Sequence, residues 1–390
     1  MSESYRALLG RPAVLPLLGA LSAAWLSFGM VGLAVILTAH GATGSYSSAG
    51  AVMSAFAFGA SMLAPVRGRI IDRHGARPWL VLFAAGFGGS LLLLAGLASS
   101  GTGTWPLIAC AGAAGISAPP LVATLRGLWS QVVEEAALRR AYTLTALIGD
   151  VGMVAAPALC GLLFVLAPWS PLVVCALSPM LGAVIVARRA PSASSRGSSR
   201  GSEPPLLGSG RMRRLLVVSV ALGAALGLVE IAVPASASRW GIERYSGLML
   251  ASFALGSVAG GLWFGRRRWR RSAQERYLLA AVCLALALAP LALATTPKAL
   301  AALLFIAGLG YGPATISLFE ALDVITRSRS TEALTWVTTA EAAGIATGAA
   351  ASGWIVSSLG SRAPFGVASL TLAVAAVGAL LFGRGKADAR

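Results

Sequence analysis

The chain has 390 residues, of which 57% are apolar and only 12% are charged. Soluble domains carry about 25% charged residues, because much of their surface must be polar. The composition therefore excludes a soluble globular protein and predicts an all-α protein embedded in a lipid bilayer, where about 20 consecutive apolar residues cross the hydrocarbon as a helix.

Twelve apolar segments have about this length. They are residues 14–37, 48–66, 79–98, 106–128, 142–166, 172–187, 215–235, 247–265, 277–294, 299–319, 334–357 and 364–383. The first segment is too long for the apolar part of a secretory signal and further spans follow it, so we expect it to be retained as a helix.

The net charge of +17 follows the predicted topology rather than marking a nucleic-acid surface. If the loops alternate across the membrane, only four of the 31 basic residues fall in outer loops: Arg239, Arg244, Lys298 and Arg362. Basic residues concentrate in cytoplasmic loops. We therefore expect a multi-pass protein of the cell's inner (cytoplasmic) membrane with both termini in the cytoplasm, and no nucleic-acid partner.

A hydrophilic segment divides the spans into two groups of six. Residues 188–214 are rich in Ser, Gly, Arg and Pro and lack apolar residues to bury, which predicts a cytoplasmic linker. The domains are then residues 1–187 and 215–390. Landmarks recur in both: Pro119 and Arg126 in span four correspond to Pro313 and Glu320 in span ten, seven residues apart in each case. The repetition predicts two pseudo-symmetric six-helix bundles.

The loop after span two carries a distinctive pattern: glycine, three residues, aspartate, arginine, one residue, glycine, one residue, arginine. Its members are Gly68, Asp72, Arg73, Gly75 and Arg77. Positive charge in an inner loop explains the arginines but not the register of the glycines and the aspartate. The loop resembles the signature loop of the major facilitator superfamily. The resemblance implies a 12-helix fold and a gating role, in which Asp72, Arg73 and Arg77 latch the cytoplasmic helix ends in one conformation and release them in another.

Span five contains Gly152, Pro157 and Gly161 in a spacing similar to the antiporter motif of the same superfamily, although Ala156 and Cys160 stand where the family has glycines. Ordinary packing of small residues between membrane helices is the alternative explanation. Together the two patterns make the chain similar to the 12-helix drug-efflux (proton antiporter) group.

Five ionisable residues lie within or at the edge of spans: Arg126, Asp150, Glu230, Glu320 and Glu341. A charge at the bilayer centre costs about 2.5–3.5 kcal/mol on insertion scales, so it is kept where it pairs, faces water or takes part in transport. For Arg126 and Glu320 a static brace or a snorkelling charge is the favoured interpretation. For Asp150 and Glu341 a brace and a proton carrier both stay open, and we expect Glu230 to contact a cation.

The chain contains no ATP-binding loop, hydrolase motif or metal-ligand cluster, so we expect neither an enzyme nor a cofactor or metal. We expect a monomeric, proton-coupled exporter of small amphipathic or cationic compounds, working by alternating access. Apolar and aromatic walls with few polar groups suit such cargo. A proton symporter that imports a nutrient, and a non-transporting sensor on the same fold, are the alternatives.

Overall fold

The computed structural model describes residues 10–189, 210–267, 269–326 and 330–384, and its secondary structure is helical throughout. The first half contains α2 (Val14–Thr43), α3 (Tyr46–Met62), α4 (Ala64–His74), α5 (Ala76–Ser99), α6 (Thr104–Ile116), α7 (Leu121–Val132), α8 (Glu135–Leu166) and α9 (Ser170–Arg189). The second half contains α10 (Gly210–Arg239), η2 (Glu243–Tyr245), α11 (Ser246–Gly265), α12 (Ala273–Leu288), η3 (Ala289–Leu293), α13 (Pro297–Thr326), α14 (Ser330–Leu359) and α15 (Ala363–Arg384).

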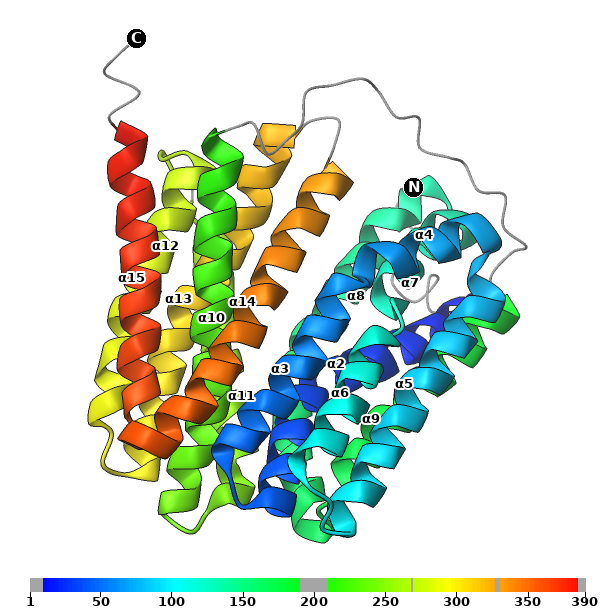
Figure 1. Ribbon diagram of the computed structural model, residues 1–390. Helices are drawn as coiled ribbons and strands as arrows, with labels where there is room; N and C mark the ends of the chain where they lie inside the picture. The colour runs from blue at the N-terminus through cyan, green and yellow to red at the C-terminus, as the bar shows by residue number, and fades with distance from the viewer. Residues whose placement is uncertain (1–9, 190–209, 268, 327–329, 385–390) are drawn as a thin grey trace.

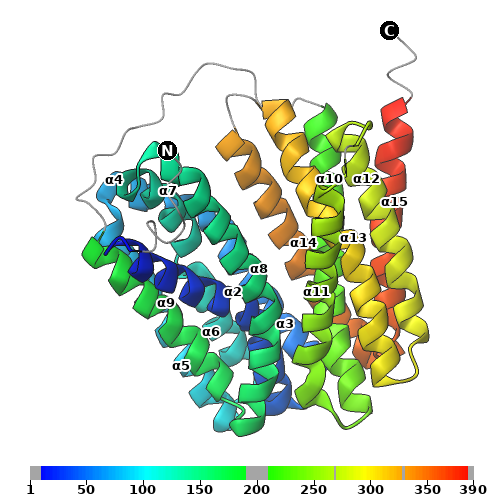
Figure 2. The ribbon, with the colours of Figure 1, turned by 180° about the vertical axis from the view of Figure 1, so that it is seen from behind.

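The helices confirm the predicted membrane fold. Among the described residues, eleven helices are long and apolar enough to span a bilayer, and the bent pair of α3 and α4 brings the number to twelve if it counts as one span. They form two helical bundles side by side (Figures 1 and 2). Most of the expected linker, residues 190–209, lies outside the described residues, so the predicted domain boundaries stay a prediction.

The segment from Gly68 to Arg77 differs from the expected turn. The helix α4 continues to His74, and the turn narrows to Gly75, whose φ of 83° favours glycine. The axes of α3 and α4 differ by 42° across the break at Leu63. Helix formation restarts there because Pro65, in the first turn of α4, has its φ already set for a helix and needs no backbone donor.

Span four is also interrupted. The helix α6 ends at Ile116 and α7 begins at Leu121, with Pro119 and Pro120 between them. Proline lacks a backbone N–H and clashes with the preceding turn, so two in succession break the helix. The carbonyl groups at the end of α6 must then find other donors.

Each bundle has an apolar interior. Tyr277 and Phe365 are the largest fully buried side chains of the second bundle, and Trp129 is the largest of the first. The end of the molecule that holds α4 and the start of α10 is called the α4 end below, and the opposite end is called the η2 end (top and bottom of Figure 1). The ribbons of the two bundles meet at the η2 end and diverge toward the α4 end in both views (Figures 1 and 2).

Candidate functional site

The two bundles meet through glycines at the η2 end. A Cβ atom on Gly50 of α3 would lie only 3.0 Å from the Cα of Gly353 in α14. On the other side, a Cβ on Gly161 of α8 would lie 2.6 Å from the Arg244 carbonyl oxygen, and one on Gly247 of α11 would meet the backbone of α8. Glycine is the residue that permits backbones to approach this closely. Main-chain atoms of the two bundles are therefore in direct contact at these glycines.

Glu230 lies where α10 faces α2. A Cβ on Gly32 of α2 would meet the Glu230 carboxylate and would lie 3.3 Å from Cε of Met53 in α3. The Glu230 side chain is half-buried, and no residue in the described ranges forms a hydrogen bond or ion pair with it. An unpaired carboxylate in such surroundings is costly, because it has lost water of hydration and no neighbouring cation offsets that loss.

Glu341 has a partner. The hydroxyl group of Tyr311 in α13 donates a hydrogen bond to Oε1 of Glu341 at 3.4 Å. The backbone of Glu341 lies so close to α10 that a Cβ on Gly223 would meet it. The half-buried carboxyl group thus has a polar contact and a closely packed backbone to hold it in place.

Asp150 lies on α8, and its side chain is exposed. It precedes Pro157 and Gly161 by seven and eleven residues, which places all three on one face of the helix at 100° per residue. That face packs against α11 at Gly161. Asp150 is therefore on the side of α8 that faces the second bundle, about 16 Å from Gly161 toward the α4 end.

The other two charges in spans lie elsewhere. Glu320 of α13 forms an ion pair with Arg276 of α12 at 2.6 Å, and the Arg276 guanidinium lies 5.7 Å from the ring centroid of Phe264. This pairing favours the interpretation of Glu320 as a brace within the second bundle. Arg126 lies on α7, beyond the helix break, and its side chain is outside the described residues.

The residues of the expected gating loop lie on or next to α4. Gly68 is helical with open space around it, and the Arg73 and Arg77 side chains are exposed. Gly75 makes the turn, and the side chain of Asp72 lies outside the described residues.

Arg67, one residue before that pattern, has a structural role that the sequence pattern did not single out. Its guanidinium is buried and donates to the carbonyl oxygens of Gly115 at 2.8 Å, Ile116 at 2.7 Å and Ala60 at 2.7 Å. Two of these carbonyls belong to the end of α6, at the interruption of span four. In the sequence, a basic residue near two spans that contain proline only weakly indicates that it caps a helix, because the linear order does not show which helix end its side chain reaches.

The residues of the antiporter-like pattern all lie at helix contacts. A Cβ on Gly152 would lie 2.9 Å from Cβ of Trp25 in α2, while Pro157 and Gly161 face Gly247 of α11. Trp25 also meets Phe28 edge to face, with ring centroids 5.5 Å apart. Its buried indole N–H has no hydrogen-bond acceptor among the described residues.

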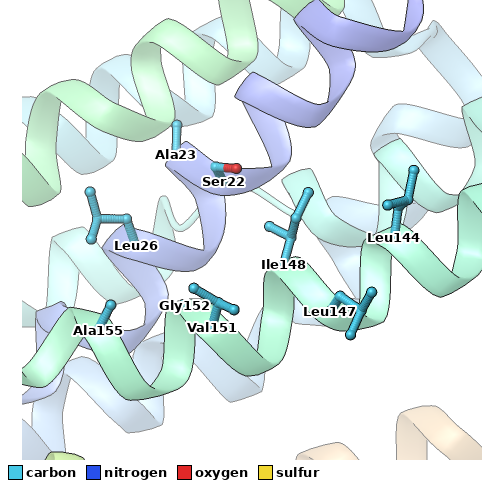
Figure 3. A pocket seen from close by; sticks show the side chains of 9 residues that line it. All are labelled: Ser22, Ala23, Leu26, Leu144, Leu147, Ile148, Val151, Gly152 and Ala155. Atoms are coloured by element: carbon cyan, nitrogen blue, oxygen red, sulfur yellow. The ribbon is translucent and has the colours of Figure 1, made fainter. Parts of the chain in front are cut away.

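A cavity of about 410 Å³ lies in the first bundle, between α2 and α8 (Figure 3). Its lining is apolar apart from one hydroxyl group, and consists of Ser22, Ala23, Leu26, Leu144, Leu147, Ile148, Val151, Gly152 and Ala155. The lining positions of α8 recur every three or four residues on a face that excludes Asp150. The cavity therefore lies on a different face of α8 from Asp150.

A second cluster that the sequence reasoning missed joins the bundles at the η2 end. The Tyr46 hydroxyl donates to Oε1 of Glu243 at 2.9 Å, and Nδ1 of His40 lies 3.0 Å from the same oxygen. These residues come from the end of α2, the start of α3 and η2, and the sequence assigned all three to outer loops or helix ends. No group of three or more potential metal ligands occurs among the residues that the structure describes.

Comparison with known proteins identifies the fold. The profile of the family described as Major Facilitator Superfamily matches residues 17–323. A mutant of the nucleoside transporter NupG superposes with a TM-score of 0.76 at 14% identity, covering 94% of this chain and 99% of that one. A POT family transporter with a bound thioalcohol-conjugated peptide gives 0.71 at 10%, covering 95% and 96%. A bacterial homologue of the human lysosomal transporter Spinster, inward-facing and unoccupied, gives 0.73 at 13%, covering 98% of both chains. A comparison with curated protein sequences gave no match.

Proposed function

Because this chain belongs to the major facilitator superfamily, we propose that it is a proton-coupled secondary transporter that exports small amphipathic or cationic compounds by alternating access. Membership of the family and transporter neighbours indicate a transporter rather than an enzyme. Each chain supplies both bundles, so a monomer suffices for the transport cycle.

The observation that carries the proposal is the unpaired carboxylate of Glu230. It lies between the bundles beside Gly32, where neither a cation nor a hydrogen-bond donor of the described chain compensates it. Such a group is retained in a membrane protein when it exchanges a proton or binds a cation during transport. Asp150, exposed on the face of α8 that packs against α11, supplies a further carboxyl group at this boundary, whereas the Glu341 carboxyl group is held by Tyr311 within the second bundle.

The balance of charge supports a cationic cargo. Glu230 and Asp150 lie on helix faces at the boundary between the bundles, whereas the buried Arg67 guanidinium is occupied by backbone carbonyls. The indole of Trp25, which packs against Gly149 and Gly152 of α8, provides an aromatic face and an N–H group without an acceptor among the described residues. Aromatic faces attract organic cations, and carboxylates neutralise them.

Alternating access has a structural basis in the glycine contacts. We infer that the α4 end faces the cytoplasm, because most basic residues outside the helices belong to that side. The described conformation then has the outer end closed and the helices apart on the cytoplasmic side (Figure 1). The residues Gly68, Asp72, Arg73, Gly75 and Arg77 would close the cytoplasmic side in the opposite state.

Proteoliposomes test this function. Vesicles that contain purified protein are given a pH gradient, and the flux of ethidium, an aromatic cation, is followed by fluorescence. Antiport predicts that ethidium moves against the proton flow, that a protonophore stops it, and that Glu230→Gln removes the response to the gradient. Flux in the direction of the protons would instead support a symporter. Tight binding without gradient-driven flux of any test compound would support a sensor.

A further inference from the structure

Three side chains form a compact cluster at the η2 end. The imidazole of His40 stacks on the ring of Tyr46, with centroids 3.9 Å apart and planes at 20°. Both side chains contact one oxygen of Glu243: Nδ1 of His40 lies 3.0 Å from Oε1, and the Tyr46 hydroxyl donates to it at 2.9 Å. The His40 side chain is 17% exposed and that of Glu243 is 25% exposed, so bulk water only partly screens the contact.

The cluster links the two moving parts of the molecule. His40 is in the last turn of α2 and Tyr46 begins α3, both in the first bundle, whereas Glu243 is in η2 of the second bundle. A Cβ on Gly353 of α14 would lie 2.5 Å from the Tyr46 carbonyl oxygen, so the cluster adjoins the glycine contact that closes this end. Any motion that separates the bundles here must break both contacts to Glu243.

The other charged groups at this end are engaged elsewhere or lie outside the cluster. Arg239 donates to Oγ of Ser361 at 3.4 Å, and the Arg244 guanidinium lies over the ring of Tyr245 at 5.1 Å. Lys298 begins α13 and Arg362 precedes α15. Facing segments of α8 and α14 contribute no charged side chain, and Glu230 is nine residues inside α10 from Arg239. The described side chains that bond to Glu243 are His40 and Tyr46.

We propose that His40, Tyr46 and Glu243 form a proton-sensitive latch that holds the η2 end closed more firmly when His40 is protonated. Imidazole is the side chain whose charge changes between pH 5 and 8. A protonated imidazole makes a charge-assisted bond to the carboxylate, about twice as strong as the neutral bond. Acid on this side of the membrane therefore favours the conformation in which the η2 end is closed, because His40 contacts Glu243 only in that conformation. The latch acts on the conformational equilibrium and is independent of the cargo and of the carboxylates proposed to couple transport.

Distance measurements between spin labels test the latch. The four native cysteines are replaced, and spin labels are attached through Ser100→Cys in the first bundle and Ser358→Cys in the second. Both positions are exposed near the η2 end. The protein is studied in lipid nanodiscs without cargo or gradient. Acidification from pH 8 to pH 5.5 should raise the ratio of closed to open populations, because the charge-assisted bond to Glu243 is present only when this end is closed.

The variants decide the assignment. His40→Gln and Glu243→Gln should each reduce the pH effect to less than about twofold and open the η2 end at pH 5.5. His74→Gln, which changes the chain's other histidine on the exposed surface of α4, should keep the full response. A response that survives in His40→Gln, or an end that stays closed in every variant at both pH values, would overturn the latch. Neither result bears on transport, because no flux is measured.

Discussion

Glu230 and Glu341 differ in what surrounds each carboxyl group, although both lie on helices at the boundary between the bundles. Glu341 accepts a hydrogen bond from Tyr311, whereas Glu230 faces the backbone of Gly32 without a described partner. A partner fixes a carboxylate in one orientation, and its absence leaves the group ready to bind a proton or a cationic ligand. We therefore assign the exchange of protons first to Glu230.

Replacement of Glu230 by glutamine should separate coupling from binding. Glu230→Gln keeps the size of the side chain and loses its charge, so flux driven by a pH gradient should fall to that of protein-free vesicles. Ethidium exchange without a gradient should persist, since the bundles still move. The measurement is ethidium flux in vesicles of the same preparation, with and without a pH gradient.

The control for this variant is Glu320→Gln, because Glu320 is paired with Arg276 inside the second bundle. It should lower thermal stability while gradient-driven flux persists. Full gradient-driven flux in Glu230→Gln would remove this residue from the coupling mechanism.

Arg67 has a different role, because its buried guanidinium satisfies three backbone carbonyls. Arg67→Met keeps most of the apolar stem but leaves those carbonyls without donors. Loss of charge-assisted hydrogen bonds of this kind destabilises by about 3 kcal/mol. We expect the unfolding midpoint in detergent to fall by several degrees. Arg69→Met removes an exposed arginine from the same helix and should leave the midpoint unchanged.

At the scale of elements, α3 and α14 cross in close backbone contact at the η2 end. The substitution Gly353→Leu would place a side chain against the backbone of Tyr46 and Ser47, where a Cβ alone would lie 2.5 and 3.0 Å from their atoms. Since neither backbone can yield without moving its helix, the bundles should separate at this end. Distances between the labels at Ser100 and Ser358 should lengthen.

The matched control is Gly366→Leu on α15, where no atom lies within 4 Å of an added Cβ. It should leave the label distances unchanged. Unaltered distances in Gly353→Leu would show that the crossing tolerates bulk and does not set the closed state.

Hydropathy was sufficient to locate the spans, because lipid imposes a length and an apolar composition on every helix that crosses it. The predicted span at residues 299–319, for example, lies within α13 (Pro297–Thr326). Hydropathy did not reveal the bend at Leu63 or the interruption at Pro119 and Pro120, since both segments remain apolar on average. It also could not pair residues that meet only in space. Glu243 was assigned to an outer loop by its position, and nothing in the linear order connects it with His40, about 200 residues earlier.

At the scale of the whole molecule, the two bundles are held at one end and apart at the other. The backbone contacts of Gly50 with Gly353 and of Gly161 with Arg244 lie at the η2 end. A rigid rocking motion about the middle would exchange the closed and the open ends, which is how repeated bundles provide access from each side in turn. Asp150 would then be covered by α11 as the α4 end closes.

This motion predicts that the reactivity of position 150 depends on conformation. In a cysteine-free background, Asp150→Cys should react quickly with a membrane-impermeant maleimide applied from the cytoplasmic side, because the side chain is exposed on the face of α8 that looks toward the second bundle. Addition of Gly353→Leu, which we expect to open the η2 end, should slow that reaction about tenfold or more by moving α8 against α11. Arg73→Cys on the exposed surface of α4 reports access of the reagent in either state, and its rate should not change. Equal rates for Asp150→Cys with and without Gly353→Leu would contradict rocking, and reaction of Arg73→Cys only from the opposite side would reverse the proposed orientation.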